Sequence, residues 1–235
     1  MKRNSALRDS VLRRTAGEIR GYNRTMKVLA ALLGMLTVVT SLLFVVAALY
    51  TESGSFTVTI DKVEMTKYAL TLSESPDMSK MTSNLNAEIH ESITNIAEES
   101  IPANVDMVDG VHNGQNYIAY TFYLQNRGEY EFPVEYSVNM TNITSGLDEA
   151  IRLKLYVNGE PTVYAKTRSD GTGPEKGAVE FYSSNVMAKG RIDILKPGEI
   201  VKFTVVLWIE GNDPDCLDPL IGGQIKAEMN INAVH

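Results

Sequence analysis

Cysteine and histidine are both scarce in this chain of 235 residues. Cys216 is the single cysteine, so no internal disulfide can form, and an exported domain would have to be held together by its core alone. The three histidines, His90, His112 and His235, are scattered and show neither a His-Glu-x-x-His pattern nor any paired spacing. These absences argue against a disulfide scaffold and against a zinc hydrolase.

The motifs of several large enzyme classes are missing as well. The chain has no Gly-x-Ser-x-Gly elbow, no Ser-x-x-Lys acylation motif and no glycine loop of the kind that cradles phosphate. We therefore predict a protein that is not an enzyme. No catalytic residue, cofactor-binding residue or metal ligand is assigned from the sequence.

Charge is absent from residues 28–50, a run of 23 residues rich in Leu, Val and Ala. A helix rises about 1.5 Å per residue, so this run covers roughly 34 Å, enough for a hydrocarbon core of about 30 Å. A buried core helix is the alternative, but no polar face marks one. The sequence predicts a single transmembrane helix at 28–50.

The charges outside that run are divided unevenly. Residues 1–27 carry eight basic side chains against two acidic ones, whereas the remainder of the chain has 14 basic and 27 acidic residues. Short basic segments stay on the cytoplasmic side, so 1–27 is predicted to be a cytoplasmic tail and 51–235 an extracellular domain at the plasma membrane. The acidic body is unsuited to nucleic acid. The lipid bilayer, through residues 28–50, is the first predicted partner.

Whether the helix is retained depends on its length. Val46 and Ala48 provide an A-x-A-like arrangement before Leu49, so cleavage near Ala48 is the competing interpretation. A hydrophobic region of 23 residues is longer than the 7–15 residues typical of a signal peptide. The length favours a retained signal anchor.

The body is dominated by short segments in which β-branched or aromatic residues recur at every second position. No helix follows each strand in turn, which disfavours a parallel βαβ arrangement. We predict a mainly β protein, an antiparallel β-sandwich of jelly-roll or Ig-like type. The predicted strands are 55–61, 68–72, 117–124, 133–140, 151–157, 162–166, 200–209 and 223–231.

Turn signals separate several of these strands. Asn158-Gly159 lies between two strand patterns and predicts a type I′ hairpin, because both central positions of that turn need positive φ. Asn126-Arg-Gly128 and Lys196-Pro-Gly198 predict two further turns.

Residues 78–99 depart from the strand pattern. Leu85, Ile89, Ile93 and Ile96 recur at helical spacing among polar residues. An amphipathic helix or a long covering loop is predicted there.

One loop gathers acidic side chains. Glu210, Asp213, Asp215 and Asp218 lie within 210–223 between two predicted strands, and hard oxygen ligands of this kind suit calcium. The spacing does not fit an EF-hand. A purely structural loop explains its Pro and Gly residues equally well. Cys216 in the same loop is expected to be a small buried residue.

Three segments of the body resemble a known group. Tyr117–Gly128, Leu195–Glu199 and Trp208–Cys216 are similar to sequences in exported β-sandwich surface proteins of Gram-positive bacteria, of the TasA and camelysin type. The common features are an N-terminal hydrophobic export segment, a strand ending in Asn-x-Gly and a Pro-Gly-Glu turn. The resemblance implies a cell-surface or biofilm-matrix component. In this chain the Asn-x-Gly element precedes the Pro-Gly-Glu turn, and no zinc motif accompanies it.

The functional prediction follows from these features. We expect a membrane-anchored structural or interaction module of the cell surface, including a matrix or fibre role, that associates with itself or with other surface proteins. The alternatives are a surface hydrolase and a calcium- or ligand-binding module that uses the 210–223 loop. Association through an unpaired sheet edge is the favoured mode. The opposing expectation is a monomer whose edges are blunted by Arg152, Lys154 and Lys202.

Overall fold

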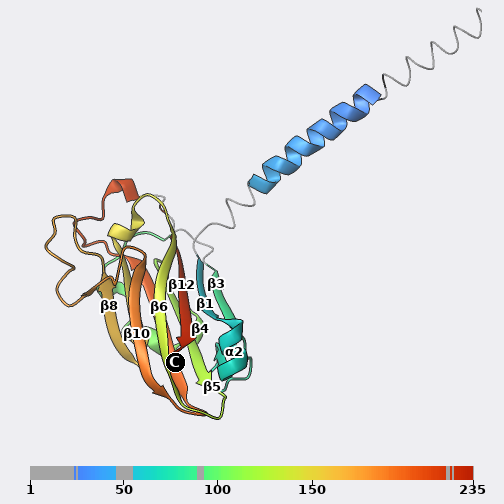
Figure 1. The fold of residues 1–235 in the computed structure, drawn as a ribbon. Coiled ribbons are helices and arrows are strands. Elements are labelled where there is room, and N and C mark those ends of the chain that lie inside the picture. Colours follow the sequence, from blue (N-terminus) through green and yellow to red (C-terminus); the bar gives the residue numbers. More distant parts are fainter. Residues whose placement is uncertain are drawn as a thin grey trace, which may run out of the picture. The chain divides into compact units, whose positions relative to one another are not determined.

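The structure is a computed structural model that describes residue 24 and residues 26–45, 55–88, 93–220, 223 and 225–234. The chain divides into two compact units, Met1–Glu52 and Ser53–His235, and each is described by itself. In the described residues the first unit is a single helix, and the second contains two β-sheets (Figure 1).

The helix of the first unit, Met26–Val45, is strongly apolar, and its Leu and Val side chains are exposed. Thr37 and Thr40 donate their hydroxyls to carbonyl oxygens one turn earlier, each at 2.9 Å, so these polar atoms are satisfied within the helix. The predicted apolar helix is confirmed as far as Val45. Residues 46–50, with the alternative cleavage position, lie outside the described residues. Length and composition suit either a membrane span or a signal sequence.

The second unit is a sandwich of two sheets, here called sheet A and sheet B. Sheet A has the order β10-β6-β12-β1-β3, and sheet B has the order β2-β5-β11-β7-β8-β9 with β4 added to β5. The strands of sheet A are β1 (Ser55–Ile60), β3 (Asn84–Glu88), β6 (Phe132–Ile143), β10 (Val186–Leu195) and β12 (Ile225–Ala233). Those of sheet B are β2 (Leu70–Ser73), β4 (Gly110–Val111), β5 (Tyr117–Asn126), β7 (Ile151–Val157), β8 (Glu160–Ala165), β9 (Val179–Glu180) and β11 (Ile200–Ile209).

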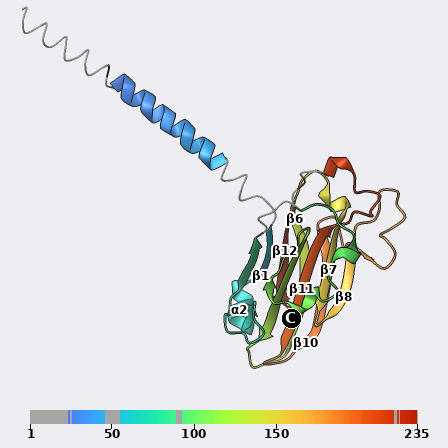
Figure 2. The same cartoon turned by 180° about the vertical axis from the view of Figure 1, so that it is seen from behind.

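The prediction of a mainly β sandwich is confirmed, but not all of its strand pairs are antiparallel. β1 pairs in parallel with β12, and β8 pairs in parallel with β9. The first parallel pair arises because the last strand of the chain fills the space between β6 and β1, so the first and last strands run side by side in the same direction (Figure 2). The sheets are therefore mixed and mostly antiparallel.

The predicted hairpin at Asn158-Gly159 is confirmed. Asn158 has φ 52° and Gly159 has φ 87°, as a type I′ turn requires, and β7 and β8 pair on either side of it. β7 and β11 have the predicted bounds. β10 was missing from the predictions, because Lys189, Gly190, Arg191 and Asp193 interrupt its apolar pattern.

The predicted strand at 68–72 begins too early. A short helix, α2 (Lys62–Tyr68), precedes β2. Asp61 caps it, since its carboxylate accepts a hydrogen bond from the Val63 amide at 2.7 Å. Val63 is 66% exposed, so α2 shows little of the apolar periodicity that would reveal it.

No α-helix lies in the described part of 78–99, so the alternative of an amphipathic helix is wrong there. Leu85 and Ala87 alternate with exposed asparagines in β3 and point into the core. Residues 89–92 are outside the described residues. From Ile93 onward the chain is a covering segment with two single 3-10 turns, η1 (Glu98–Ser100) and η2 (Val105–Met107). The alternative of a long covering loop is correct for this part.

The main core lies between the sheets, and a second, smaller core lies on the outer face of sheet B. The covering segment 93–116 contributes Ile101 and Val105, which pack with Tyr156, Val206 and the fully buried Trp208. Sheet B is therefore buried on both faces. This explains why β11 is apolar at nearly every position rather than alternating.

The outer face of sheet A is open and polar. Figure 1 shows it with no other described segment in front of it. Its outward positions carry mostly hydroxyl and amide side chains: Thr57, Thr59, Asn84, Asn86, Ser137, Asn139, Thr141, Asn230 and Asn232. On the inner side, a Cβ at Gly190 of β10 would come within 2.2 Å of the Tyr136 ring, so glycine lets that ring pack against the strand.

Candidate functional site

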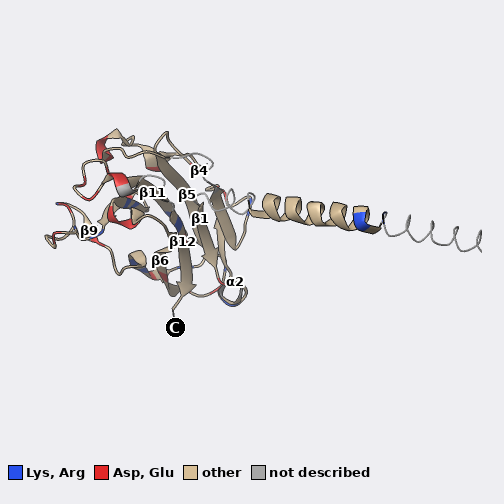
Figure 3. Cartoon of the chain, turned by 90° about the horizontal axis from the view of Figure 1, so that it is seen from above, with Lys and Arg blue, Asp and Glu red and all other residues tan. Residues whose placement is uncertain are grey.

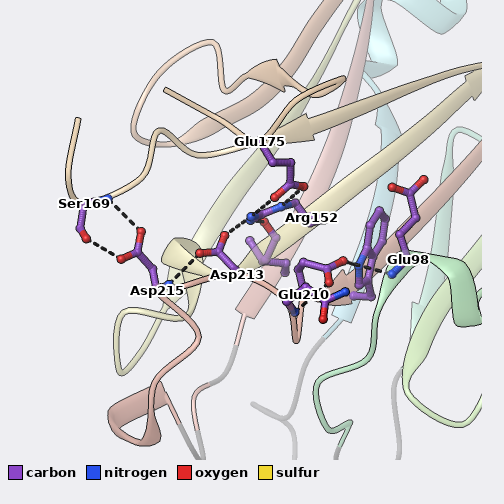
Figure 4. Close-up of polar contacts among 10 residues, drawn as sticks. Glu98, Arg152, Ser169, Glu175, Glu210, Asp213 and Asp215 are labelled. Atoms are coloured by element: carbon purple, nitrogen blue, oxygen red, sulfur yellow. Dashed lines mark hydrogen bonds and ion pairs between the residues drawn. The ribbon is translucent and has the colours of Figure 1, made fainter. Parts of the chain in front are cut away.

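A buried arginine organises the loops at the end of the sandwich where β1 begins. Arg152 is the second residue of β7 and points to the outer face of sheet B, where its side chain has no exposed surface. Its Nε and Nη2 donate to the two carboxylate oxygens of Glu175, each at 2.7 Å. Nη2 also donates to Asp213, and Nη1 donates to the Ile151 carbonyl at 3.0 Å. Figure 4 shows Arg152 held between the two carboxylates.

These contacts join two loops that are distant in sequence. Glu175 belongs to the loop between β8 and β9, and Asp213 to the loop between β11 and β12. Asp213 also accepts a hydrogen bond from the Asp215 amide at 2.7 Å, and Asp215 in turn accepts bonds from the amide and hydroxyl of Ser169. The two loops are thus fastened to each other twice, through Arg152 and through Ser169.

A second acidic group fastens the covering segment. Glu210 is buried and accepts hydrogen bonds from the Trp208 indole at 2.9 Å and from the Glu98 amide at 3.1 Å. The Asn212 amide donates to its other oxygen at 2.9 Å. Lys154 of β7 pairs with the Glu98 carboxylate at 2.9 Å. Both oxygens of the Glu210 carboxylate therefore accept hydrogen bonds from groups of this chain.

This geometry shifts the pKa values of Arg152 and Asp215. Burial alone lowers the pKa of Arg152, but hydrogen bonds and charge from Glu175 and Asp213 outweigh it and raise that pKa above its ordinary value. The hydroxyl and amide of Ser169 lower the pKa of Asp215. Arg152 therefore stays charged although it is buried, and its charge holds the carboxylates of Glu175 and Asp213.

The acidic residues of the alternative calcium site lie in one loop, and three of the four already accept hydrogen bonds. Glu210, Asp213 and Asp215 accept the bonds just described, and Asp218 begins the short turn η4 (Asp218–Leu220). Among the described residues, no group of three or more His, Cys, Asp or Glu is arranged to hold a metal ion. Figure 3 shows acidic residues, coloured red, on the loops near β9 and β11. The observed contacts agree with the structural interpretation of this loop.

Cys216 and the histidines were also singled out from the sequence. Cys216 lies in the same loop as the acidic residues and is half-buried, not buried as expected, and its Sγ accepts a hydrogen bond from the Asn95 side-chain amide at 3.5 Å. The ring nitrogens of His112 contact the carbonyl oxygens of Gly110 and Val105, whereas His90 and His235 are outside the described residues.

The charges expected to blunt the edges are not at edges. Arg152, Lys154 and Lys202 lie on β7 and β11, which are interior strands of sheet B. Polar and charged residues occur at outward positions of a strand whether or not another segment covers them. The sequence therefore could not show that the covering segment lies over these positions. The role of Arg152, and with it the roles of Glu175 and Ser169, was therefore missed. The one available signal was the excess of apolar residues on both faces of β11.

The opposite end of the sandwich is organised by Asn126, the first residue of the Asn-x-Gly element. Its fully buried side chain donates to the carbonyl oxygens of Tyr130 and Leu195, at 2.8 and 2.9 Å, and accepts from the Gly128 amide at 2.8 Å. Its backbone carbonyl accepts from the Gly198 amide at 2.7 Å. The Asn-x-Gly and Pro-Gly-Glu elements therefore meet in one structural unit.

Comparisons with known proteins leave the chain without a family. No family model matches it, and no curated protein matches it. A solved structure of AvmM, which catalyses macrocyclization in alchivemycin A biosynthesis, is 12% identical with a TM-score of 0.24, covering 51% of this chain and 80% of that protein. A β-glucosidase from Kluyveromyces marxianus in complex with glucose is 12% identical with a TM-score of 0.26, covering 71% of this chain. The chain spans 16% of the length of that enzyme. Scores at this level carry no argument about function.

Proposed function

We propose that this protein is a single-pass, membrane-anchored module of the cell surface that works by association and not by catalysis. In this proposal residues 1–27 lie in the cytoplasm, residues 28–50 cross the plasma membrane, and the sandwich of residues 51–235, of jelly-roll or Ig-like type, lies outside. A role in a surface matrix or fibre of a Gram-positive bacterium is the specific form that the sequence resemblance favours.

The observation that carries this proposal is the uncovered apolar helix beside a basic segment. Its leucines and valines are exposed along its full described length, from Met26 to Val45, which is unfavourable in water. Residues 46–54 then connect it to β1. A bilayer would cover that apolar surface, and the basic residues before it favour a cytoplasmic N-terminus.

Two edge regions of the sandwich are poorly suited to pairing with a further strand. β10 at one edge of sheet A carries two register irregularities and the exposed charges Lys189, Arg191 and Asp193. β8 pairs with β9 only at its last two positions, and the free part of β8 contains Pro161. Bulges, charges and proline all hinder pairing with a further strand. The open outer face of sheet A, where hydroxyl and amide side chains lie beside charged residues such as Lys226 and Glu228, is the surface we propose for the association.

The surface-hydrolase alternative calls for a polar pocket with titratable groups of shifted pKa. Two hollows in the described part of the chain are lined by residues of α2, the start of β2 and the β2–β3 and β5–β6 connections. The raised pKa values of Tyr120 and Tyr123 arise from burial and from hydrogen bonds to Glu74 and Asp109, and neither tyrosine lines these hollows. No observation therefore favours this alternative.

Photocrosslinking in cells tests the proposed function. A photoreactive residue is placed at Asn230 on the open face of sheet A, and a matched one at Asp170, which is exposed on the β8–β9 loop. We expect a discrete adduct from Asn230, either a dimer of this chain or a complex with one surface protein, and none from Asp170. Absence of adducts from Asn230, together with a monomer at every concentration in sedimentation of the full chain, would overturn the proposal.

A further inference from the structure

A hollow of about 310 Å³ lies at the end of the sandwich opposite Ser55. One side is formed by Lys67 and Tyr68 at the end of α2, and the other by the β5–β6 connection from Gly128 to Phe132. β1 begins at Ser55 at one end of the sandwich and ends at the other, where α2 follows it. The hollow therefore lies at the end opposite Ser55 (Figures 1 and 2).

The two sides of this hollow are held together by short-range contacts. Asn126 fixes the connection by bonding both the Gly128 amide and the Tyr130 carbonyl. Gly128 lies so close to α2 that a Cβ there would be 2.9 Å from the Tyr68 carbonyl oxygen. A site fixed in this way loses little conformational freedom when a ligand binds.

The hollow is aromatic inside and polar at its rim. The Tyr68 and Phe132 rings lie 5.0 Å apart at 55°, and Tyr130 is 78% exposed beside them. Lys67, Glu129 and Glu131 are exposed around these rings. The Lys67 ammonium lies 5.0 Å from the centre of the Tyr68 ring. The rim thus carries the carboxylates of Glu129 and Glu131 and the ammonium of Lys67, so acidic groups outnumber basic ones.

We propose that this hollow binds a neutral saccharide unit of a cell-surface polysaccharide. A pyranose ring with equatorial hydroxyls has an apolar C–H face, which suits the exposed Tyr130 ring, and hydroxyls at its edge, which suit Lys67 and the two glutamates. Because acidic groups outnumber basic ones at the rim, an acidic saccharide is disfavoured there. This inference rests on the proposed function, because the hollow meets such a polysaccharide only if the sandwich is outside the cell.

The size of the hollow favours a saccharide over a proline-rich peptide. Small-molecule sites occupy about 300–1,000 Å³, and this hollow is at the lower end of that range. A polyproline helix extends about 3.1 Å per residue and docks along an elongated aromatic groove. The lining here comes from two short segments, 67–68 and 128–132, which suits a compact ring.

The test uses the full chain in lipid nanodiscs, which avoids detergents with sugar headgroups. Cellotriose and chitotriose are titrated by calorimetry, with a proline-rich decapeptide as the comparison ligand. We expect saturable binding of at least one trisaccharide at one site per chain. Tyr130→Ala should weaken it at least about tenfold, whereas Tyr130→Phe, which keeps the ring, should stay within about threefold.

Tyr182→Ala is the matched control, because Tyr182 is 67% exposed on the loop before β10 and distant from the hollow in sequence. It should leave saccharide binding unchanged. Absence of saturable trisaccharide binding, binding of the decapeptide alone, or equal effects of the two alanine variants would overturn the inference. The photocrosslinks from Asn230 are independent of Tyr130, so failure at the hollow and failure of the proposed surface association can be told apart.

Discussion

At the scale of single residues, the most consequential side chain is Arg152. It is buried, charged and satisfied by Glu175, Asp213 and a backbone carbonyl. The residues of the two loops that it joins are mostly exposed or half-buried, so little apolar burial holds them in place. The ion pairs therefore carry a large share of the local stability of these loops.

Replacement of Arg152 by leucine should be strongly destabilising. The change leaves two carboxylates facing each other without their cation, and loss of one partner of a buried pair typically costs about 3–5 kcal/mol. Urea unfolding of the full chain, followed by the fluorescence of Trp208, measures this cost. Lys189→Leu is the control, since its pair with Glu135 is exposed and should contribute about 0–1 kcal/mol.

The triple change of Arg152→Leu, Glu175→Gln and Asp213→Asn should recover part of the loss, because no uncompensated charge is then left. If Arg152→Leu and Lys189→Leu have equal effects, the buried network does not stabilise the loops.

The raised pKa of Tyr123 leads us to expect a loss of stability at high pH. Burial first, then the hydrogen bond and the charge of Asp109, raise the pKa of Tyr123 to about 12. In the unfolded chain a tyrosine loses its proton near about pH 10. Between these values the native state holds the proton and the unfolded state does not. Stability from this group is therefore complete below about pH 10 and falls as the pH rises toward 12.

Unfolding free energies of the wild type and of Tyr123→Phe between pH 9 and about pH 12 check this. The variant should show a shallower decline, whereas Tyr182→Phe, at an exposed position, should decline like the wild type. Identical slopes for all three proteins would show that Asp109 and burial do not hold the Tyr123 proton.

At the scale of elements, the covering segment 93–116 explains why sheet B has no exposed face. Trp208 lies beneath this segment, fully buried, and its indole donates to Glu210. Glu210 also accepts from the Glu98 amide, so the tryptophan, the β11–β12 loop and the covering segment form one unit.

Trp208→Ala should therefore destabilise the sandwich by about 3–5 kcal/mol, through a cavity and the loss of one of the hydrogen bonds to Glu210. Thermal unfolding followed by circular dichroism measures it. Trp208→Phe should cost clearly less, because the ring still fills most of the space. An alanine variant that melts with the wild type would mean that the covering segment contributes little.

The elements also show what the sequence could and could not predict. β7, β11 and the Asn158-Gly159 hairpin were predictable because alternating side chains and a positive-φ turn act locally. β10 was missed, because its charges face solvent at an edge where packing imposes little pattern. β3 was misjudged because Leu85, Ile89 and Ile93 fit a helical period as well as a strand followed by a covering segment.

The candidate sites were less predictable than the fold. The acidic loop was recognised, but its partners Arg152 and Ser169 are far away in sequence and only the fold brings them close. Likewise, Asn126 was recognised as a turn residue, whereas its contacts with Tyr130 and Leu195 depend on how two hairpin ends pack.

At the scale of the whole molecule, the proposed function depends on whether the apolar helix stays in the membrane or is removed. If the helix is retained, the sandwich is tethered by residues 46–54, with its network of loops at the tethered end and the aromatic hollow at the other. If the helix is removed, the same sandwich is a free secreted domain. The fold of the sandwich is the same in both cases, so they must be distinguished by an experiment on cells.

The most direct test inserts a site for a specific protease between Ser53 and Gly54 and applies that protease to intact cells. The account predicts that the sandwich is released into the medium only after treatment, and that mass spectrometry finds a membrane fragment containing residues 1–53. A sandwich already in the medium with Leu49 as its first residue, or one released only after the cells are lysed, would contradict the account.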